Sequence, residues 1–441
     1  MSELIEQQQP KHPQEKRLRE LDAKDKLTDK EFAEYEVLKK IVESMPAIEQ
    51  FRANQSAPYE DKKSRAANLA WEFFNAMEGK CYVAVGGLDS ITLYLFLRSI
   101  GIDVPAVSVS ALEDRSIQAV HRALGVQQLK PLKTKVEVIR EFGWPVISKE
   151  VAGKIQHLQN PTPKNATIRH AIITGETGKQ GGYRKGTRMQ LAKKWLERFG
   201  GYENEAEGTD YQIPDFKVSD RCCYYLKEKP CNDYAKRSGR WPYMGLMASE
   251  GGRRQKALMI HGCNYISATT KRSAPFATFL RDDILRLAQE MDAWYQENLA
   301  LFPGPALQSI IPEIYGEIRF DENGKRYTTK AQRTGCSMCG FGIHMEKRPH
   351  RFDQLWQRNP KEWTFWMHRV AKLPDGTWYG WGHVLDYIGV GWRDPWKFTA
   401  NSKEEFEQIR IDDGEELPRE TGGDGWENAL GDCGSDQCVG E

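Results

Sequence analysis

The sequence predicts an α/β protein with a doubly wound parallel sheet. A strand-like apolar run at 81–85 precedes a helical pattern at 91–100, and a second strand at 105–110 precedes a helix that ends at Gly125. Strands that alternate with helices in this way are typical of parallel βαβ units. A glycine-containing turn joins the first strand to its helix, at the sheet edge where open α/β sheets bind ligands. We therefore expect a ligand site at that turn.

Length and composition limit the class of protein. A chain of 441 residues is long enough for two or three domains. The formal net charge of +1 gives no global sign of a polyanionic partner, and no apolar run is long enough to cross a bilayer. Residues 1–26 are polar and lack the apolar core of a secretory signal. We expect a cytoplasmic protein without membrane contact, and the sequence does not indicate its oligomeric state.

Composition shifts divide the chain into four regions. We expect a helical N-terminal region at 1–78, an α/β domain at 79–290, a C-terminal domain at 291–400 that holds the CxxC and most tryptophans, and an acidic flexible tail at 401–441. Within the α/β domain, residues 153–217 form a glycine-rich, basic insertion. This insertion is either a solvated surface segment or a lid whose cations, mostly at 160–200, contact a nucleic acid.

The turn at 83–90 reads VAVGGLDS and is suited to an anion. Gly86 and Gly87 can adopt positive φ and let an oxyanion approach backbone N–H groups at the start of a helix. Asp89 and Ser90 could cap that helix or reach a ligand or its Mg²⁺. The spacing matches neither GxGxxG nor GxxxxGK[ST], so a dinucleotide fold and a Walker-type loop both fit poorly. An ordinary strand-turn-helix corner is the alternative.

The nine cysteines cluster in a way that predicts a metal centre. Cys222 and Cys223 are adjacent, and Cys336 and Cys339 form a CxxC in a glycine-rich turn. Adjacent cysteines are poor disulfide partners for each other, whereas two pairs supply the four thiolates of an iron-sulfur or zinc site. Unliganded buried thiols are the alternative. Cys231 or Cys263 could replace one member of the set, while Cys81, His344 and His383 are interpreted as packed or surface residues.

These motifs carry a family resemblance over about 78–392. GGLDS resembles the SGGxDS pyrophosphate loop of the N-type ATP pyrophosphatases, the superfamily that includes the phosphoadenosine phosphosulfate (PAPS) reductases, with Val85 in place of the leading Ser. The CC and CxxC pattern, with the segment CCYYLKEKP, resembles the ligand set of a 4Fe-4S iron-sulfur cluster in assimilatory adenylylsulfate reductases. The part from CxxC onward is similar to a bacterial and phage branch of the PAPS reductase family. The resemblance implies an adenine nucleotide alpha hydrolase-like sheet.

Other segments carry further site residues by the same resemblance. The segment GLMASEGGRRQKAL is similar to the family's phosphate-contacting GxRxxES..R, although Met247 and Gly251 depart from it. The nucleotide-binding residues that the resemblance implies are Gly86, Gly87, Asp89, Ser90, Glu113, Lys149, Gly245, Glu250, Arg254 and Arg272, with Asp283 as a further match. Of these, Asp89, Ser90 and Arg254 are the expected catalytic residues.

The resemblance implies an enzyme that binds an adenine nucleotide and Mg²⁺. The retained Asp and Ser favour cleavage of ATP to AMP and pyrophosphate, which would activate a substrate for sulfur transfer or reduction with a sulfur donor or thioredoxin-like reductant as partner. One alternative is reductive cleavage of PAPS or adenylylsulfate (APS), although the tail around Cys433 and Cys438 is acidic and lacks the family's ECG-type nucleophile. The other is a nucleotide or redox sensor without turnover. The acceptor substrate is not indicated.

Overall fold

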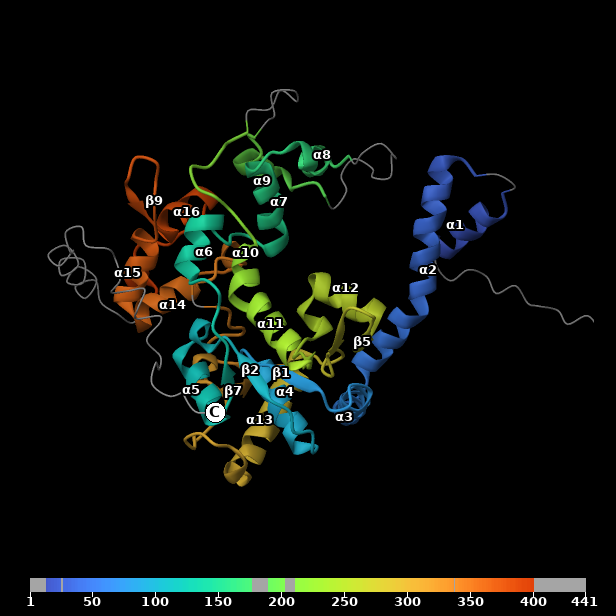
Figure 1. The fold of residues 1–441 in the computed structure, drawn as a ribbon, viewed down its shortest axis with the longest axis vertical. Helices are drawn as coiled ribbons and strands as arrows, with labels where there is room; N and C mark the ends of the chain where they lie inside the picture. Colours follow the sequence, from blue (N-terminus) through green and yellow to red (C-terminus); the bar gives the residue numbers. More distant parts are fainter. Residues whose placement is uncertain (1–12, 25–26, 177–188, 203–210, 337, 400–441) are drawn as a thin grey trace, which may run out of the picture.

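The structure is a computed structural model that describes residues 13–24, 27–176, 189–202, 211–336 and 338–399 (Figure 1). The strands are β1 (Cys81–Ala84), β2 (Ala106–Ser108), β3 (Gln127–Gln128), β4 (Trp241–Tyr243), β5 (Asn264–Ile266), β6 (Lys271–Ser273), β7 (Ile318–Phe320), β8 (Arg326–Thr328), β9 (Ala371–Lys372) and β10 (Trp378–Tyr379). The helices up to residue 200 are α1 (Pro13–Asp22), α2 (Asp29–Ser56), α3 (Tyr59–Ala76), α4 (Leu88–Ser99), α5 (Arg115–Ala123), α6 (Lys135–Phe142), α7 (Lys149–Gln159), α8 (Ala166–Thr174) and α9 (Lys193–Phe199). The later helices are α10 (Arg221–Cys223), α11 (Lys229–Ser238), α12 (Gly252–His261), α13 (Arg281–Glu297), α14 (Arg351–Arg358), α15 (Pro360–His368) and α16 (Trp381–Ile388).

A mostly parallel six-stranded sheet forms the centre of the fold, which confirms the α/β prediction. The strand order is β3-β2-β1-β4-β6-β5, and only β5 runs antiparallel to its neighbour. The chain leaves β1 toward β2 and β3 on one side and later returns to β4 on the other. The strand order therefore reverses at β1, and the carboxyl end of β1 is the topological switch point where such sheets bind ligands.

The residues of β1 alternate between two layers of helices. Cys81 and Val83 belong to the main hydrophobic core with α3, α4 and α13, whereas Tyr82 and Ala84 pack with Tyr234 of α11 on the opposite face. This alternation follows from the two-residue period of a strand. Because both faces are covered, β1 is buried almost throughout, as its run of apolar residues predicts.

A second core lies apart from the sheet and is rich in tryptophan. Helices α7 and α9 from the insertion pack against α14, α15 and α16 from the C-terminal part, and the two groups lie on the same side of the molecule in Figure 1. Its largest members are seven buried tryptophans: Trp144, Trp195, Trp356, Trp363, Trp366, Trp381 and Trp392. The described part of the insertion at 153–217 is therefore a packed layer of this second core, since Trp195 and Phe199 are buried in it. Residues 177–188, which hold much of its basic stretch, lie outside the described residues.

Three helices precede the sheet within the part of the chain that the structure describes. Thr28 and Glu31 form a capping box at the start of α2, and α3 packs onto the main core through Ala66, Ala70 and Phe73. Helices α1 and α2 extend away from the rest of the molecule in Figure 1. Among the described residues, no helix is both long enough and apolar enough to span a membrane.

Candidate functional site

The loop between β1 and α4 lies at the switch point and is held by its own serine. The Gly86 N–H donates to Ser90 Oγ at 2.8 Å, and the Ser90 hydroxyl donates to the Gly87 carbonyl at 2.9 Å. Gly87 is the N-cap of α4 at a φ of −80°, and neither glycine has the positive φ that the sequence suggested. Because these glycines have no side chain, other groups can approach the loop backbone closely.

The close approach is made by a tyrosine from the C-terminal part of the chain. The Leu88 N–H donates to the Tyr315 hydroxyl at 3.0 Å, and that hydroxyl shares a 2.6 Å hydrogen bond with Thr334 Oγ1. A Cβ on Gly87 would lie 2.3 Å from the Tyr315 hydroxyl and 2.7 Å from Thr334 Oγ1. Any side chain at this position would clash, so glycine is required. The two hydroxyls thus lie directly against the loop between β1 and α4.

Asp89 is held by an arginine that the sequence did not single out. The Arg281 guanidinium donates to Asp89 Oδ1 at 2.8 Å and to the Gln332 carbonyl at 2.9 Å. Burial raises the pKa of Asp89, and the positive charge of Arg281 opposes that rise. Arg281 therefore links the loop to the segment that precedes the CxxC.

A buried acid and a buried histidine support the other side of the loop. Glu113, the residue expected near the nucleotide, lies 3.5 Å from the position of a Cβ on Gly86, and its Oε1 accepts from Lys227 Nζ at 2.6 Å. His121 is fully buried; Nε2 lies 2.8 Å from the Gly86 carbonyl and Nδ1 lies 2.6 Å from Ser110 Oγ. Burial lowers the pKa of His121, so the ring is neutral at neutral pH.

The four predicted cysteine ligands come together beside this loop. Burial raises the pKa of Cys222, Cys223 and Cys336, and the charges of the neighbouring thiols, Cys339 included, raise it further, to about 12 for Cys223. The two pairs are far apart in sequence, so their electrostatic interaction results from the tertiary fold. The thiol set therefore lies between α10 and the turn at 336–339.

Lysines surround these thiols. Lys227 hydrogen-bonds Cys336 as well as Glu113; burial lowers its pKa, but the charges of these two partners outweigh burial and the pKa is raised. Lys135 acts on Cys222 and Cys336, and Lys149 acts on Cys223. Cations in these places stabilise negative charge on sulfur.

The donor chemistry of this set fits an iron-sulfur cluster. Four thiols with cationic neighbours match the needs of a cluster that carries net negative charge with its thiolates. Among the described residues, no three His, Cys, Asp or Glu side chains are arranged around a single point as a metal ion requires. A four-iron cluster gives each cysteine its own iron, so its thiolates stand farther apart than the ligands of one ion.

The remaining sequence-predicted residues fall into two groups. Gly245 reaches the loop, because a Cβ there would lie 3.0 Å from Ser90 Cα. Glu250 pairs with Arg254 at 2.5 Å, and its charge acts on Asp89. Lys149 pairs with Glu228 and lies beside Cys223 of the thiol set. Arg272 makes its contact elsewhere, on the Tyr265 ring at 5.4 Å. Asp283 forms a buried ion pair with Lys62 at 2.5 Å, which is a structural role.

Sequence reasoning missed four residues of the site: Arg281, Tyr315, Thr334 and Lys227. Lys227 belongs to the segment CCYYLKEKP, whose basic continuation after the cysteines was a usable signal. Thr334 lies two residues before Cys336, so its proximity to the thiols was predictable but its contact with the loop was not. Arg281 and Tyr315 stand in helical and turn segments without any local motif.

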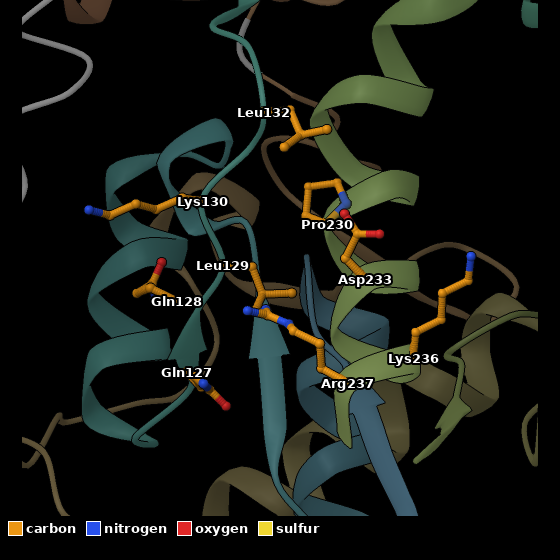
Figure 2. Close-up of a pocket in the computed structure, with 9 residues that line it drawn as sticks. All are labelled: Gln127, Gln128, Leu129, Lys130, Leu132, Pro230, Asp233, Lys236 and Arg237. Carbon is orange, nitrogen blue, oxygen red and sulfur yellow. The ribbon is translucent and has the colours of Figure 1, made fainter. Parts of the chain in front are cut away.

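A cavity lies between α11 and the segment that includes and follows β3, and none of the residues of the β1–α4 loop line it. It measures about 730 Å³ and is lined by Gln127, Gln128, Leu129, Lys130, Leu132, Pro230, Asp233, Lys236 and Arg237 (Figure 2). Arg237 extends toward Leu129, whereas Lys130 points away from α11. Its polar groups therefore do not converge on one ligand, as they must in a specific site, and we place the candidate site at the loop instead.

No family model, curated protein or solved structure matches this chain. Its function must be inferred from its own residues. Cys433 and Cys438, the thiols considered for a redox role, lie outside the described residues.

Proposed function

We propose that this chain is an adenine-nucleotide-binding iron-sulfur protein of the PAPS reductase family, within the N-type ATP pyrophosphatase superfamily. In this proposal, its sheet has the doubly wound, adenine nucleotide alpha hydrolase-like form. The enzyme cleaves ATP to AMP and pyrophosphate and thereby activates a substrate for sulfur transfer or reduction.

One observation carries the proposal: the cysteine set and the GGLDS loop share a single connected site. The Lys227 ammonium hydrogen-bonds both Cys336 and Glu113, and Glu113 lies against Gly86. Two motifs that the sequence places far apart are thus joined by one lysine. A phosphate loop or a cysteine cluster alone would have a structural explanation, whereas their adjacency favours joint chemistry.

In the proposed reaction, the oxygen of an acceptor attacks the α-phosphorus of ATP. The bond to the bridging oxygen breaks, pyrophosphate leaves with that oxygen, and the acceptor becomes adenylated. Asp89 would hold Mg²⁺ on the phosphates, because a carboxylate is the ligand this ion prefers. Arg254 and Arg281 would offset the charge that develops on the leaving pyrophosphate, since each ends near the loop on an acidic partner it can exchange for phosphate.

Cys222, Cys223, Cys336 and Cys339 would hold the cluster, and Lys135, Lys149 and Lys227 would stabilise their thiolates. When bound, the cluster would supply electrons or a sulfur-binding iron next to the activated acceptor. Lys227 would also hold the Glu113 carboxyl beside the loop, since its Nζ donates to Glu113 Oε1 at 2.6 Å.

Two measurements test this function. Pyrophosphate release from labelled ATP with Mg²⁺ is expected, and Asp89→Asn should reduce it by at least tenfold while Asp103→Asn, an exposed acid on the same layer, leaves it unchanged. Anaerobically purified protein should contain iron and acid-labile sulfide. A colourless protein with zinc would contradict the cluster, and ATP that neither binds nor releases pyrophosphate would contradict the enzyme.

Direct reductive cleavage of PAPS or APS is the second candidate, because the same adjacency of thiols and loop would serve it. That reaction needs a reactive thiolate at the sulfur. Burial raises the pKa of Cys81, Cys222, Cys223, Cys263 and Cys336, which leaves few thiolates at neutral pH. Release of sulfite from PAPS or APS without pyrophosphate release from ATP would favour the reductase.

A further inference from the structure

We propose that Tyr315 is a positioning residue that couples nucleotide binding to the CxxC turn. In this structure its hydroxyl accepts a hydrogen bond from the Leu88 N–H, a donor that a phosphate oxygen could also engage. Nucleotide binding displaces it, and its bond to Thr334 transmits the change to the turn at 336–339. This inference rests on the proposed nucleotide function and adds a regulatory link within that site.

The first support is the identity of the group that Tyr315 binds. Leu88 is the first residue of α4, so its N–H is one of the donors that no carbonyl inside the helix can satisfy. The Tyr315 hydroxyl accepts this hydrogen bond from a place that no side chain at position 87 could share. A phosphate bound at the start of α4 and the hydroxyl of Tyr315 therefore compete for one donor.

The second support is the relative strength of the two acceptors. A charged phosphate oxygen makes a hydrogen bond roughly twice as strong as a neutral hydroxyl does. Tyr315 is almost fully buried, and burial raises its pKa to about 12, so it stays a neutral hydroxyl at neutral pH. The exchange of Tyr315 for phosphate on Leu88 N–H is favourable for this reason.

The third support is a second link between the same two segments. Arg281 joins Asp89 to the Gln332 carbonyl, and Thr334 joins Tyr315 two residues before Cys336. Phosphate and Mg²⁺ compete for Arg281 and Asp89 in the same way that phosphate competes for Leu88. Both links between the loop and residues 332–334 are therefore made by groups that a nucleotide would engage.

The first experiment measures affinity on the full chain as purified. Calorimetry with Mg²⁺ and α,β-methylene-ATP, which resists cleavage at the proposed bond, should show that Tyr315→Phe binds about 2- to 10-fold more tightly than the wild type, because a competing hydrogen bond is gone. Tyr295→Phe is the matched control: its buried hydroxyl accepts the Leu307 N–H at 3.3 Å, remote from the loop. Its affinity should equal that of the wild type.

The second experiment follows hydrogen-deuterium exchange in residues 329–336. Exchange at 333–336 should be faster in the wild type with the analogue than without it, and equally fast in Tyr315→Phe without the analogue. In Thr334→Val, residues 333–336 should exchange fast both with and without the analogue, because valine cannot form the hydrogen bond to the Tyr315 hydroxyl. Thr334→Ser keeps a hydroxyl and should restore the dependence on the analogue.

The outcomes of these experiments distinguish a failure of the Tyr315 coupling from a failure of the proposed nucleotide function. Analogue binding without a change in exchange at 333–336, or weaker binding by Tyr315→Phe, overturns the coupling and leaves the proposed function standing. A protein that binds no analogue in either form overturns the proposed function and the coupling with it.

Discussion

The two hydrophobic cores of this molecule differ in their secondary structure and in their content of tryptophan. Both cores contain many aliphatic residues, but the main core combines a mostly parallel sheet with helices and has no tryptophan among its buried members, whereas the second core includes no strand of that sheet and holds seven buried tryptophans. The segment at 333–339 passes from one to the other: Thr334 bonds Tyr315 of the main core, and Met338 is buried in the second. The comparison indicates that the candidate site depends on the relation of the two cores, because its CxxC belongs to neither alone.

The largest expected effect is on metal content. Cys336→Ser with Cys339→Ser removes two thiolates on the segment between the cores, so bound iron should fall to background in anaerobically purified protein. Cys231→Ser and Cys263→Ser are the controls, and both should keep their iron. Loss of iron in either control would mean that the ligand set is wrong.

The next largest effect is on the free energy of unfolding, which we expect to differ between the two cores. Trp381→Ala and Phe96→Ala each leave a cavity at a fully buried site, one in each core, and each should lower the free energy of unfolding of its own core by about 3–5 kcal/mol. Denaturant unfolding followed by tryptophan fluorescence and by circular dichroism should show two transitions, each sensitive to one variant. A single transition that both variants shift equally would make the cores one cooperative unit.

The third effect is a pH dependence on the main-core side of the site. Burial raises the pKa of Asp89, and Mg²⁺ needs the carboxylate, so affinity for Mg²⁺ with α,β-methylene-ATP should be lost as the pH falls through this raised pKa. The loss should begin above the pH at which an ordinary Asp protonates and should approach tenfold per pH unit. Calorimetry over a pH series measures it, and a flat profile in Asp89→Asn is the control. A wild-type profile as flat as that of the variant would exclude Asp89 as the magnesium ligand.

The smallest effect concerns His121 beneath the loop. Its pKa is lowered in the folded state, so the unfolded chain binds a proton first as the pH falls below about 6.5, the ordinary value. The free energy of unfolding should therefore fall by at most about 1.4 kcal/mol per pH unit in that range and be unaffected at higher pH. Thermal melting over roughly pH 5–8, a range that brackets this value, would check the prediction, and His121→Gln should lack the contribution. An equal slope in the variant would assign it to other groups.

Much of the main core was predictable because its signals are local. The apolar run of β1, the helix after it and the glycine turn between them each follow from neighbouring residues, and β1 and α4 lie where the sequence places them. The grouping of Cys222 and Cys223 with Cys336 and Cys339 followed from the ligand count of a metal site. In each of these features, the residue types and their spacing in the sequence are enough to predict the local structure or the kind of ligand.

The rest depends on contacts between distant segments. Arg281 and Tyr315 have no motif, and they enter the site only because α13 and the turn at 313–315 pack beneath α4 in the main core. Composition suggested a solvated insertion as one interpretation of 153–217, yet α7 and α9 are buried against the tryptophans. Hydrophobic residues on short helices do not reveal which distant surface they cover, so the second core could not be read from the sequence.

The segment that joins the cysteine pair to Lys227 is a single wide turn, the π-helix at Tyr224–Glu228 between α10 and α11. Such a turn holds one residue more than an α-helical turn would. Lys227 lies within this turn, and removing one residue between Tyr224 and Leu226 would shift Lys227 by one position along the helix relative to Cys222 and Cys223. The helix would survive such a deletion, but Lys227 and the thiols would no longer face the same space. The spacing of this segment is therefore under a stricter constraint than its side chains, and variants that change its length should be more damaging than those that change its composition.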